Sequence, residues 1–385
     1  MDGALPAVLF ITLLFLVNYT NRAILGPLLV HMEKGLGLNH VQATSFLLFL
    51  SIGFSLGLLC SGFMTARIAP RKVMAFSAIG SGVMLLCIAQ SSTLGSVRIL
   101  FGLLGVVAGV YTPAAMAALG SLVKPKYWSR AVAIHEISPP LSFILSPLLA
   151  ETLAVYSGWQ SALTVVGCLS LLVGGMFLFA GKGGEQTTDR PSIGGITETL
   201  RWPIFWGFVW LFALAVGGEF APYSVLQLSL TTEQGLNSTE ASRLLSLSRI
   251  ISPFTVLLGG WATNRFGAVR AILFFLGVHG IALMAMALPV SMIGRSGVFV
   301  AMSIQAMITA FVFPPLFAFL VGSFPAGRQA LLLSLSLPIA LYIGGGFIPF
   351  LLGFCGEYLS FALGYFILGA VCLVTIPVLY LCRKQ

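Results

Sequence analysis

Three ionisable side chains stand in the middle of long apolar stretches: Arg22, Glu219 and Arg249. A charged group inside the hydrocarbon of a membrane is costly, so it marks a functional site by default. At a helical rise of about 1.5 Å per residue, each lies about 22 to 25 Å from the same membrane face. A guanidinium stays charged and offers a planar fork of donors that fits carboxylate, phosphate or sulfonate. The spacing therefore predicts an anion site near the midplane, with Glu219 as switch or coupling acid.

An ion pair is the alternative interpretation of the same residues. Glu219 would then neutralise Arg22 or Arg249 and hold helices together without binding a substrate. The two interpretations overlap, because such a pair can open when a substrate or a proton arrives.

Polar and aromatic residues at similar depth are further candidates for the site. A Gln or Tyr without a partner is expensive in lipid, so such side chains should face a cavity or another helix. Individually, each is about as suited to packing as to binding. The predicted substrate-binding residues are Arg22, Arg249, Tyr19, Asn18, Asn21, Tyr111, Tyr223, Gln305 and Tyr342.

A second acidic candidate, Glu136, follows His135 about 10 Å into another apolar stretch. The two residues could bind a substrate or a proton, so Glu136 joins Glu219 as a candidate for the coupling or switch role. The alternative is an interfacial pair of Glu136 with Arg130 or Lys126.

The composition requires lipid around these residues. Of the 385 residues, 58% are hydrophobic and 8% are charged, whereas an ordinary soluble domain has about 25% charged residues. The mean hydropathy is +1.02. A soluble fold cannot hide so much apolar surface, and a disordered chain would need low hydrophobicity, so both classes are excluded. The net charge of +9 lies in basic residues between apolar segments, which favours membrane topology over nucleic acid as the explanation.

No motif predicts a cofactor, a metal or an enzyme. The six cysteines lie inside apolar segments without a CxxC pair and are interpreted as small hydrophobes. The sequence has no HExxH motif and no paired Asp for an intramembrane active site.

Apolar stretches long enough to cross a bilayer require about 20 residues each. The sequence contains about twelve of them, which predicts an all-α integral membrane protein with twelve transmembrane helices. They lie near 5–31, 41–66, 72–90, 97–123, 129–155, 159–181, 203–230, 239–264, 269–290, 295–323, 328–354 and 357–382.

The longest polar connection, 182–202, falls at the midpoint. It predicts an N-terminal bundle of six helices over 1–181, a cytoplasmic linker over 182–202 and a C-terminal bundle over 203–385. An internal repeat at an offset of 198 supports two pseudo-symmetric halves, since it aligns Gly62 with Gly260 and Arg67 with Arg265. Lys and Arg concentrate in alternate connections, which puts both termini in the cytoplasm. The compact loops favour a bacterial inner membrane.

The two loops that contain Arg67 and Arg265 carry a repeated motif. GFMTARIAPRK and GWATNRFGAVR resemble the G-x-x-x-D-R-x-G-R-R loop of the major facilitator superfamily. The resemblance implies that family's twelve-helix fold, and a cytoplasmic gate formed by Arg67, Arg71, Arg265 and Arg270. Ala66 and Asn264 replace the acidic residue, so the latch should be altered or weak. Positive-inside anchoring is the alternative role for these arginines.

The first span also resembles one branch of this family. NYTNRAILGP, which begins at Asn18, is similar to the N-Y-x-D-R signature of the sialin-like organic-anion symporters. Asn18, Tyr19 and Arg22 match, which implies recognition of an anion by Arg22. Asn21 replaces the acid that takes part in proton coupling in that branch, and Gly105 stands nearest to its fourth-helix glutamate. That coupling apparatus is therefore not carried over.

These observations predict a secondary active transporter of a small organic anion that works by alternating access, as a symporter coupled to protons or another ion such as sodium. The alternative is efflux of amphipathic drugs or metabolites by the same fold, which the aromatic content favours. The implied partners are the anion, a proton or sodium ion and the lipid bilayer, and the chain is expected to be a monomer that binds no nucleic acid.

Overall fold

A computed structural model describes residues 3–188, 195–323 and 329–382. All of the regular secondary structure among these residues is helical, and most of the helices are apolar. The chain divides into two compact units, which are described separately. The first contains residues 1–38 and 45–194, and the second contains 39–44 and 195–385. Part of the predicted linker, 189–194, lies outside the described residues, and the domain boundaries at 181 and 203 stay predictions.

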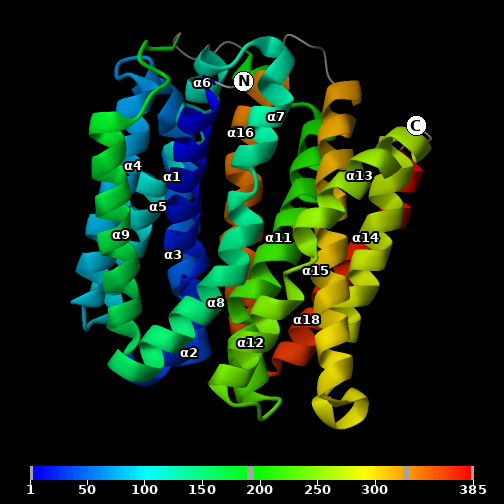
Figure 1. Ribbon diagram of the computed structural model, residues 1–385. Helices are drawn as coiled ribbons and strands as arrows, with labels where there is room; N and C mark the ends of the chain where they lie inside the picture. Colours follow the sequence, from blue (N-terminus) through cyan, green and yellow to red (C-terminus); the bar gives the residue numbers. More distant parts are fainter. Residues whose placement is uncertain (1–2, 189–194, 324–328, 383–385) are drawn as a thin grey trace. The chain divides into compact units, whose positions relative to one another are not determined.

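The first unit is a bundle in which the long helix α4 runs alongside α9 (Figure 1), and α1 packs against α8 and α9. Helix α3 begins in residues assigned to the second unit, and the rest of it belongs to the first. The helices are α1 Leu5–Ala23, α2 Leu25–Leu36, α3 His40–Thr65, α4 Pro70–Ala89, α5 Leu94–Gly109, α6 Tyr111–Leu122, η1 Pro125–Tyr127, α7 Trp128–His135, α8 Ser138–Ser157 and α9 Trp159–Ala180.

The second unit packs around α11, which contacts α15, α16 and α17. The short helix α10 lies inside the segment predicted as a polar linker. The helices are α10 Ile196–Leu200, α11 Pro203–Thr232, α12 Ser238–Ser248, α13 Ser252–Phe266, α14 Ala268–Ala285, α15 Val290–Ser323, α16 Gln329–Tyr342, the π-helical turn η3 Ile343–Phe347, α17 Ile348–Tyr358 and α18 Phe361–Cys382.

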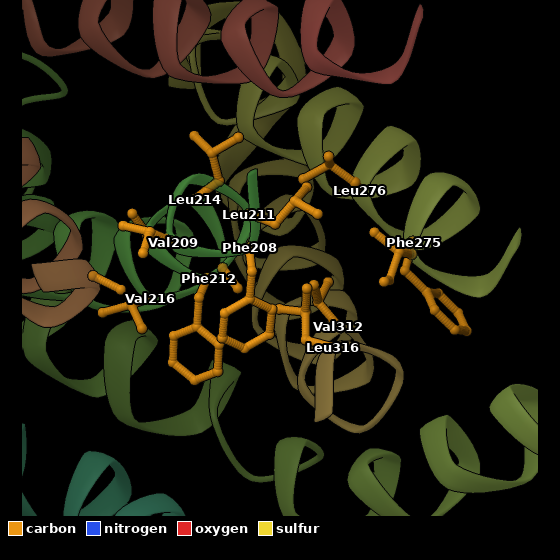
Figure 2. Close-up of a cluster of buried hydrophobic side chains, with 14 of the residues drawn as sticks. Phe208, Val209, Leu211, Phe212, Leu214, Val216, Phe275, Leu276, Val312 and Leu316 are labelled. Carbon is orange, nitrogen blue, oxygen red and sulfur yellow. The ribbon is translucent and has the colours of Figure 1, made fainter. Parts of the chain in front are cut away.

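The core of the second unit is aromatic and aliphatic. Figure 2 shows Phe208 and Phe212 of α11 beside Val312 and Leu316 of α15, and all four side chains are buried or nearly so. The rings of Phe212 and Phe313 meet edge to face at 5.7 Å, a favourable geometry for aromatic quadrupoles. This packing fixes α11, which carries Glu219, against α15, which carries Gln305.

The prediction of an all-helical, multi-pass membrane protein is confirmed, whereas the number twelve is not. Ten spans in the described residues are long and apolar enough to cross a membrane, and the bent pair α12–α13 would be an eleventh. The last predicted span corresponds to α18, whose described apolar stretch, Phe361–Pro377, is not among these crossings.

Several predicted spans are interrupted near a proline. The interruptions lie at Ile24, Val110, Glu136–Ile137 and Arg249–Ile251. Proline has no N–H and its ring collides with the carbonyl four residues earlier, so it weakens the helix at that point. Pro27, Pro113, Pro140 and Pro253 stand at that distance from Ala23, Gly109, Glu136 and Arg249. The candidate residues Arg22, Tyr111, Glu136 and Arg249 therefore lie at or beside proline-induced breaks.

Candidate substrate and coupling site

Arg22 lies in the last turn of α1, one residue before that helix ends. Its guanidinium carbon is 4.7 Å from the centroid of the Tyr19 ring and 4.2 Å from that of Phe54. Both distances are in the range of cation–π attraction. Its Nε is buried and has no hydrogen-bond partner, and no carboxylate among the described residues of the first unit forms an ion pair with Arg22. In the first unit, two aromatic rings thus contact the Arg22 guanidinium, and its Nε–H donor has no partner.

Asn18 and Asn21 anchor α1 to its neighbours in the first unit. The Asn18 amide donates to Ser77 Oγ on α4 at 3.0 Å, and the Asn21 amide donates to Ser170 Oγ on α9 at 2.9 Å. Both asparagines are buried. These contacts favour a positioning role for the two amides, and their place in the substrate site stays a prediction.

Gly105 lies where α5 touches α3, at the position nearest to the expected glutamate. A Cβ built on Gly105 would lie 2.1 Å from the carbonyl oxygen of Leu50 and 2.6 Å from the backbone nitrogen of Phe54. Such close approach of two backbones is typical of small residues at membrane helix interfaces. A glutamate could not occupy this position without separating the two helices, which gives a physical reason for its absence.

Tyr111 and Glu136 meet through His135. The Tyr111 hydroxyl donates to the Ile11 carbonyl at 2.9 Å and lies 3.3 Å from His135 Nε2. His135 Nδ1 lies 3.0 Å from Glu136 Oε1. Tyr111 is fully buried, whereas the Glu136 side chain is 48% exposed. Glu136 therefore pairs with His135, and it forms no ion pair with Arg130 or Lys126 among the described residues.

The second unit brings together Glu219, Tyr223 and Arg249. Glu219 and Tyr223 are one turn apart on α11, and Arg249 is the C-terminal cap residue that directly follows α12. The Arg249 guanidinium carbon is 5.3 Å from the centroid of the Tyr223 ring, and its charge acts on Glu219 electrostatically. Arg249 is 97% buried, since its exposed fraction is 3%. A half-buried Glu219 that feels the charge of the buried Arg249 fits both the switch role and the ion-pair alternative for this unit.

Gln305 on α15 compensates for a backbone hydrogen bond that α11 lacks at Pro222. Pro222 removes the N–H that would normally bond to the Gly218 carbonyl. The Gln305 amide supplies that donor, at 2.5 Å from Gly218 O, and also donates to Thr309 Oγ1 at 3.0 Å. Gln305 is fully buried, so its amide group is structural in this arrangement, and substrate contact stays a prediction.

His279 on α14 is a site residue that the sequence did not single out. It is fully buried, its Nδ1 lies 3.2 Å from Thr309 Oγ1, and its Nε2 is buried without a hydrogen-bond partner. The His279 ring packs against Gly218, which precedes Glu219 in the sequence. The sequence showed a lone histidine in an apolar run, which is usually a packing residue, and no local signal linked it to α11 or α15.

Tyr342 is half-buried at the end of α16, directly before the π-helical turn of Gly344, Gly345 and Gly346. A π-helical turn inside a helix is frequent at functional sites. No contact of its hydroxyl joins Tyr342 to the residues above among the described interactions.

Of the four predicted gate arginines, Arg71 has clear partners in the structure. Its Nη2 donates to the Leu178 carbonyl at 2.6 Å, near the C-terminus of α9, where the helix dipole favours a cation. This contact lies within the first unit. Arg67, Arg265 and Arg270 are exposed, in agreement with anchoring at a polar face, and a latch between the halves stays a prediction.

The structure thus defines a polytopic helical membrane protein with a half-buried arginine, Arg22, and a buried arginine, Arg249, at the ends of broken helices. A model of the Major Facilitator Superfamily matches residues 11–349. The chain therefore belongs to the major facilitator superfamily, and it is a transporter rather than an enzyme.

Individual relatives are distant. A probable nitrate/nitrite transporter, NarK2 of Mycobacterium tuberculosis, is 21% identical over 292 residues, which is 74% of this chain and 73% of the relative. A bacterial homolog of the human lysosomal transporter Spinster superposes with a TM-score of 0.80 at 15% identity, over 97% of this chain and 95% of that one. A D-xylose–proton symporter superposes with a TM-score of 0.74 at 14% identity, over 96% and 95%. The structural matches support the fold alone.

Proposed function

We propose that this chain is a secondary active transporter that takes up a small organic anion by alternating access, in symport with protons or another cation. The group recognised is a planar oxyanion, of which a carboxylate is the organic example. The curated nitrate/nitrite relative supports this choice, because nitrate presents the same flat arrangement of oxygens.

The observation that carries the proposal is the unneutralised Arg22. A partly buried cation without a counter-ion is unfavourable in a membrane, so the cost is tolerated where a ligand supplies the opposite charge. Tyr19 and Phe54 cover the guanidinium by their rings, and stacking of this kind leaves the N–H edges available. Two N–H groups on one edge bind an oxyanion as a fork, which is stronger and more directional than a point charge.

The second unit would contribute Arg249 and its coupled acid. Arg249 is the second proposed anion ligand, and Glu219 is the proposed switch, since a carboxylate that leaves Arg249 frees it for substrate. Glu136 is the second proposed coupling acid. Tyr223 contacts Arg249 through its ring and would position it.

We also propose the architecture that this mechanism requires. The bent pair α12–α13 and helix α18 would complete twelve crossings in two bundles, over 1–181 and 203–385, joined by a cytoplasmic linker over 182–202. The monomer would lie in a bacterial inner membrane with both termini in the cytoplasm and with Arg67, Arg71, Arg265 and Arg270 at the cytoplasmic gate.

Uptake into proteoliposomes tests the proposal. Labelled lactate, formate and nitrate should enter vesicles that contain the wild-type chain, whereas glucose, which has no anionic group, should not. Arg22→Gln should abolish entry. Arg22→Lys should reduce it at least tenfold, because lysine keeps the charge but loses the planar fork and the stacking.

Arg98→Gln is the matched control, because Arg98 also lies near a phenylalanine ring, at 5.8 Å from Phe49, but donates to Ser45 Oγ. Entry that is unaffected by Arg22→Gln would contradict the proposal. Resistance to amphipathic drugs that survives this substitution would instead support the efflux alternative.

A further inference from the structure

His135 lies in a chain of hydrogen bonds that one proton completes. The chain runs from the Ile11 carbonyl on α1 to the Tyr111 hydroxyl on α6, then to His135 at the end of α7 and to Glu136. We infer that His135 and Glu136 form a proton-binding site at the break between α7 and α8, in which the imidazolium is the loaded form. The further role of this site in coupling rests on the proposed symport function.

The count of donors and acceptors supports the inference. A neutral His135 with its hydrogen on Nδ1 satisfies Glu136, but its Nε2 and the Ile11 carbonyl then compete for the single hydrogen of Tyr111. The other neutral tautomer satisfies Tyr111 but turns a lone pair of Nδ1 toward the carboxylate of Glu136. One added proton resolves both conflicts, because Nδ1–H then donates to Glu136, Nε2–H donates to Tyr111, and Tyr111 donates to Ile11.

The surroundings favour a cation at this position. The Phe15 ring stacks on His135 with centroids 4.1 Å apart and planes 6° from parallel, so one face of the imidazolium would lie over an aromatic π-system. His135 is fully buried, whereas the Glu136 side chain is half-exposed, so a proton would enter and leave the site through Glu136.

Other ionisable groups on the packed elements are few. Helix α7 packs against α1, α6 and η1. In contact with His135 are Tyr111 and Glu136. The other ionisable residues described on these elements and on α7 are Tyr19, Arg22, Lys126, Tyr127 and Arg130, and Lys126 lies over the ring of Tyr127 at 4.9 Å.

Protonation of His135 would change how α1, α6 and α7 are held together at the site. With the proton absent, the Tyr111 hydroxyl can turn away from Ile11 and bond to Nε2. With the proton present, Tyr111 is committed to Ile11, and α1, α6 and α7 are tied together. Since Arg22 is on α1, the proton would change the restraint on the helix that carries the proposed anion ligand.

A direct test follows the imidazole nitrogens. The full chain is labelled with ¹⁵N-histidine, placed in nanodiscs and titrated between about pH 4 and pH 9 by NMR. The signal that His135→Gln removes should titrate in the wild type. In Glu136→Gln it should show proton binding at least tenfold weaker, because a charge-assisted hydrogen bond is lost.

The second His–Glu pair of the unit, His31 and Glu151 at 2.9 Å, gives the matched control. Glu151→Gln should leave the His135 titration unchanged. A His135 signal that does not titrate, or that titrates identically in Glu136→Gln, would overturn the inference.

Coupling is tested separately in proteoliposomes with lactate and nitrate. His135→Gln and Glu136→Gln should retain exchange of labelled for unlabelled anion, within about threefold, but should lose accumulation driven by a pH gradient. Accumulation that persists in both variants would overturn the coupling role. If the wild type shows no exchange, the proposed function is wrong, and the NMR titration still decides the proton site.

Discussion

Gly218 on α11 leaves room for the ring of His279 on α14. A Cβ built on Gly218 would lie 1.9 Å from His279 Nε2. His279 cannot withdraw easily, since it is fully buried on α14 and its other nitrogen lies beside Thr309. The His279 ring, rather than the backbone conformation of α11, therefore requires a glycine at position 218.

Gly218→Ala should destabilise the protein. Forcing a methyl group into a filled core costs about 1–3 kcal/mol, so the apparent melting temperature in detergent should fall. Gly207→Ala on the same helix is the control, because nothing lies within 4 Å of its Cβ position and alanine stabilises a helix interior by roughly 0.5–1 kcal/mol. Equal melting temperatures for Gly218→Ala and the wild type would show that the ring moves freely.

At the scale of the helices, a side chain of α15 supplies a hydrogen bond that the backbone of α11 lacks. Pro222 leaves the Gly218 carbonyl without its helical donor, and the Gln305 amide fills the place. A carbonyl buried without a partner costs about 1–3 kcal/mol. The two residues should therefore be energetically coupled although they lie on different helices.

A double-mutant cycle measures this coupling. Gln305→Leu alone should lower the stability by about 1–3 kcal/mol. In the background of Pro222→Ala, whose new N–H can bond to Gly218 O, the same substitution should cost at least 1 kcal/mol less, by the logic of such cycles. Stability in detergent, measured by reversible denaturation, gives the four values. Strict additivity would mean that Gln305 does not serve the proline.

Hydropathy predicted most of these helices, because about 20 apolar residues in a row have few alternatives to a membrane span. It also predicted that Arg22, Glu219 and Arg249 are unusual, since a charge in such a run is visible without a structure. Glycines and prolines favour kinks, and a π-helical turn contains Gly344–Gly346 while the α7–α8 break directly precedes Pro139–Pro140.

The partners of these residues could not be read from the sequence. Pro222 predicts a carbonyl without a helical donor at Gly218, but the sequence around it does not indicate that Gln305, on another helix, supplies the donor. His279 gave no signal, because one histidine in an apolar helix has no period or motif. Phe54 was likewise one of 30 phenylalanines, and its contact with Arg22 depends on how α3 packs against α1.

At the scale of the whole molecule, the number of crossings decides where the chain ends. Ten or twelve crossings put both termini on one side of the membrane, and eleven put them on opposite sides. The concentration of Lys and Arg in alternate connections predicts the cytoplasmic side for both. The bent pair α12–α13 and helix α18 decide between these topologies.

Reporter fusions test this topology. Green fluorescent protein at the C-terminus should fluoresce, and alkaline phosphatase there should be inactive, because that enzyme is active only in an oxidising compartment. Phosphatase fused after Gly235, in the connection between α11 and α12, should be active. An active phosphatase at the C-terminus would contradict the proposal of twelve crossings.

The hydrogen bond between Gln305 and Gly218 has a consequence for related sequences. A chain that lacks a proline at the position of Pro222 has no free carbonyl there and no need for an amide at the position of Gln305. A chain that keeps the proline but replaces the glutamine leaves a polar group stranded. The two positions should consequently change together during evolution, although they lie 83 positions apart along the chain.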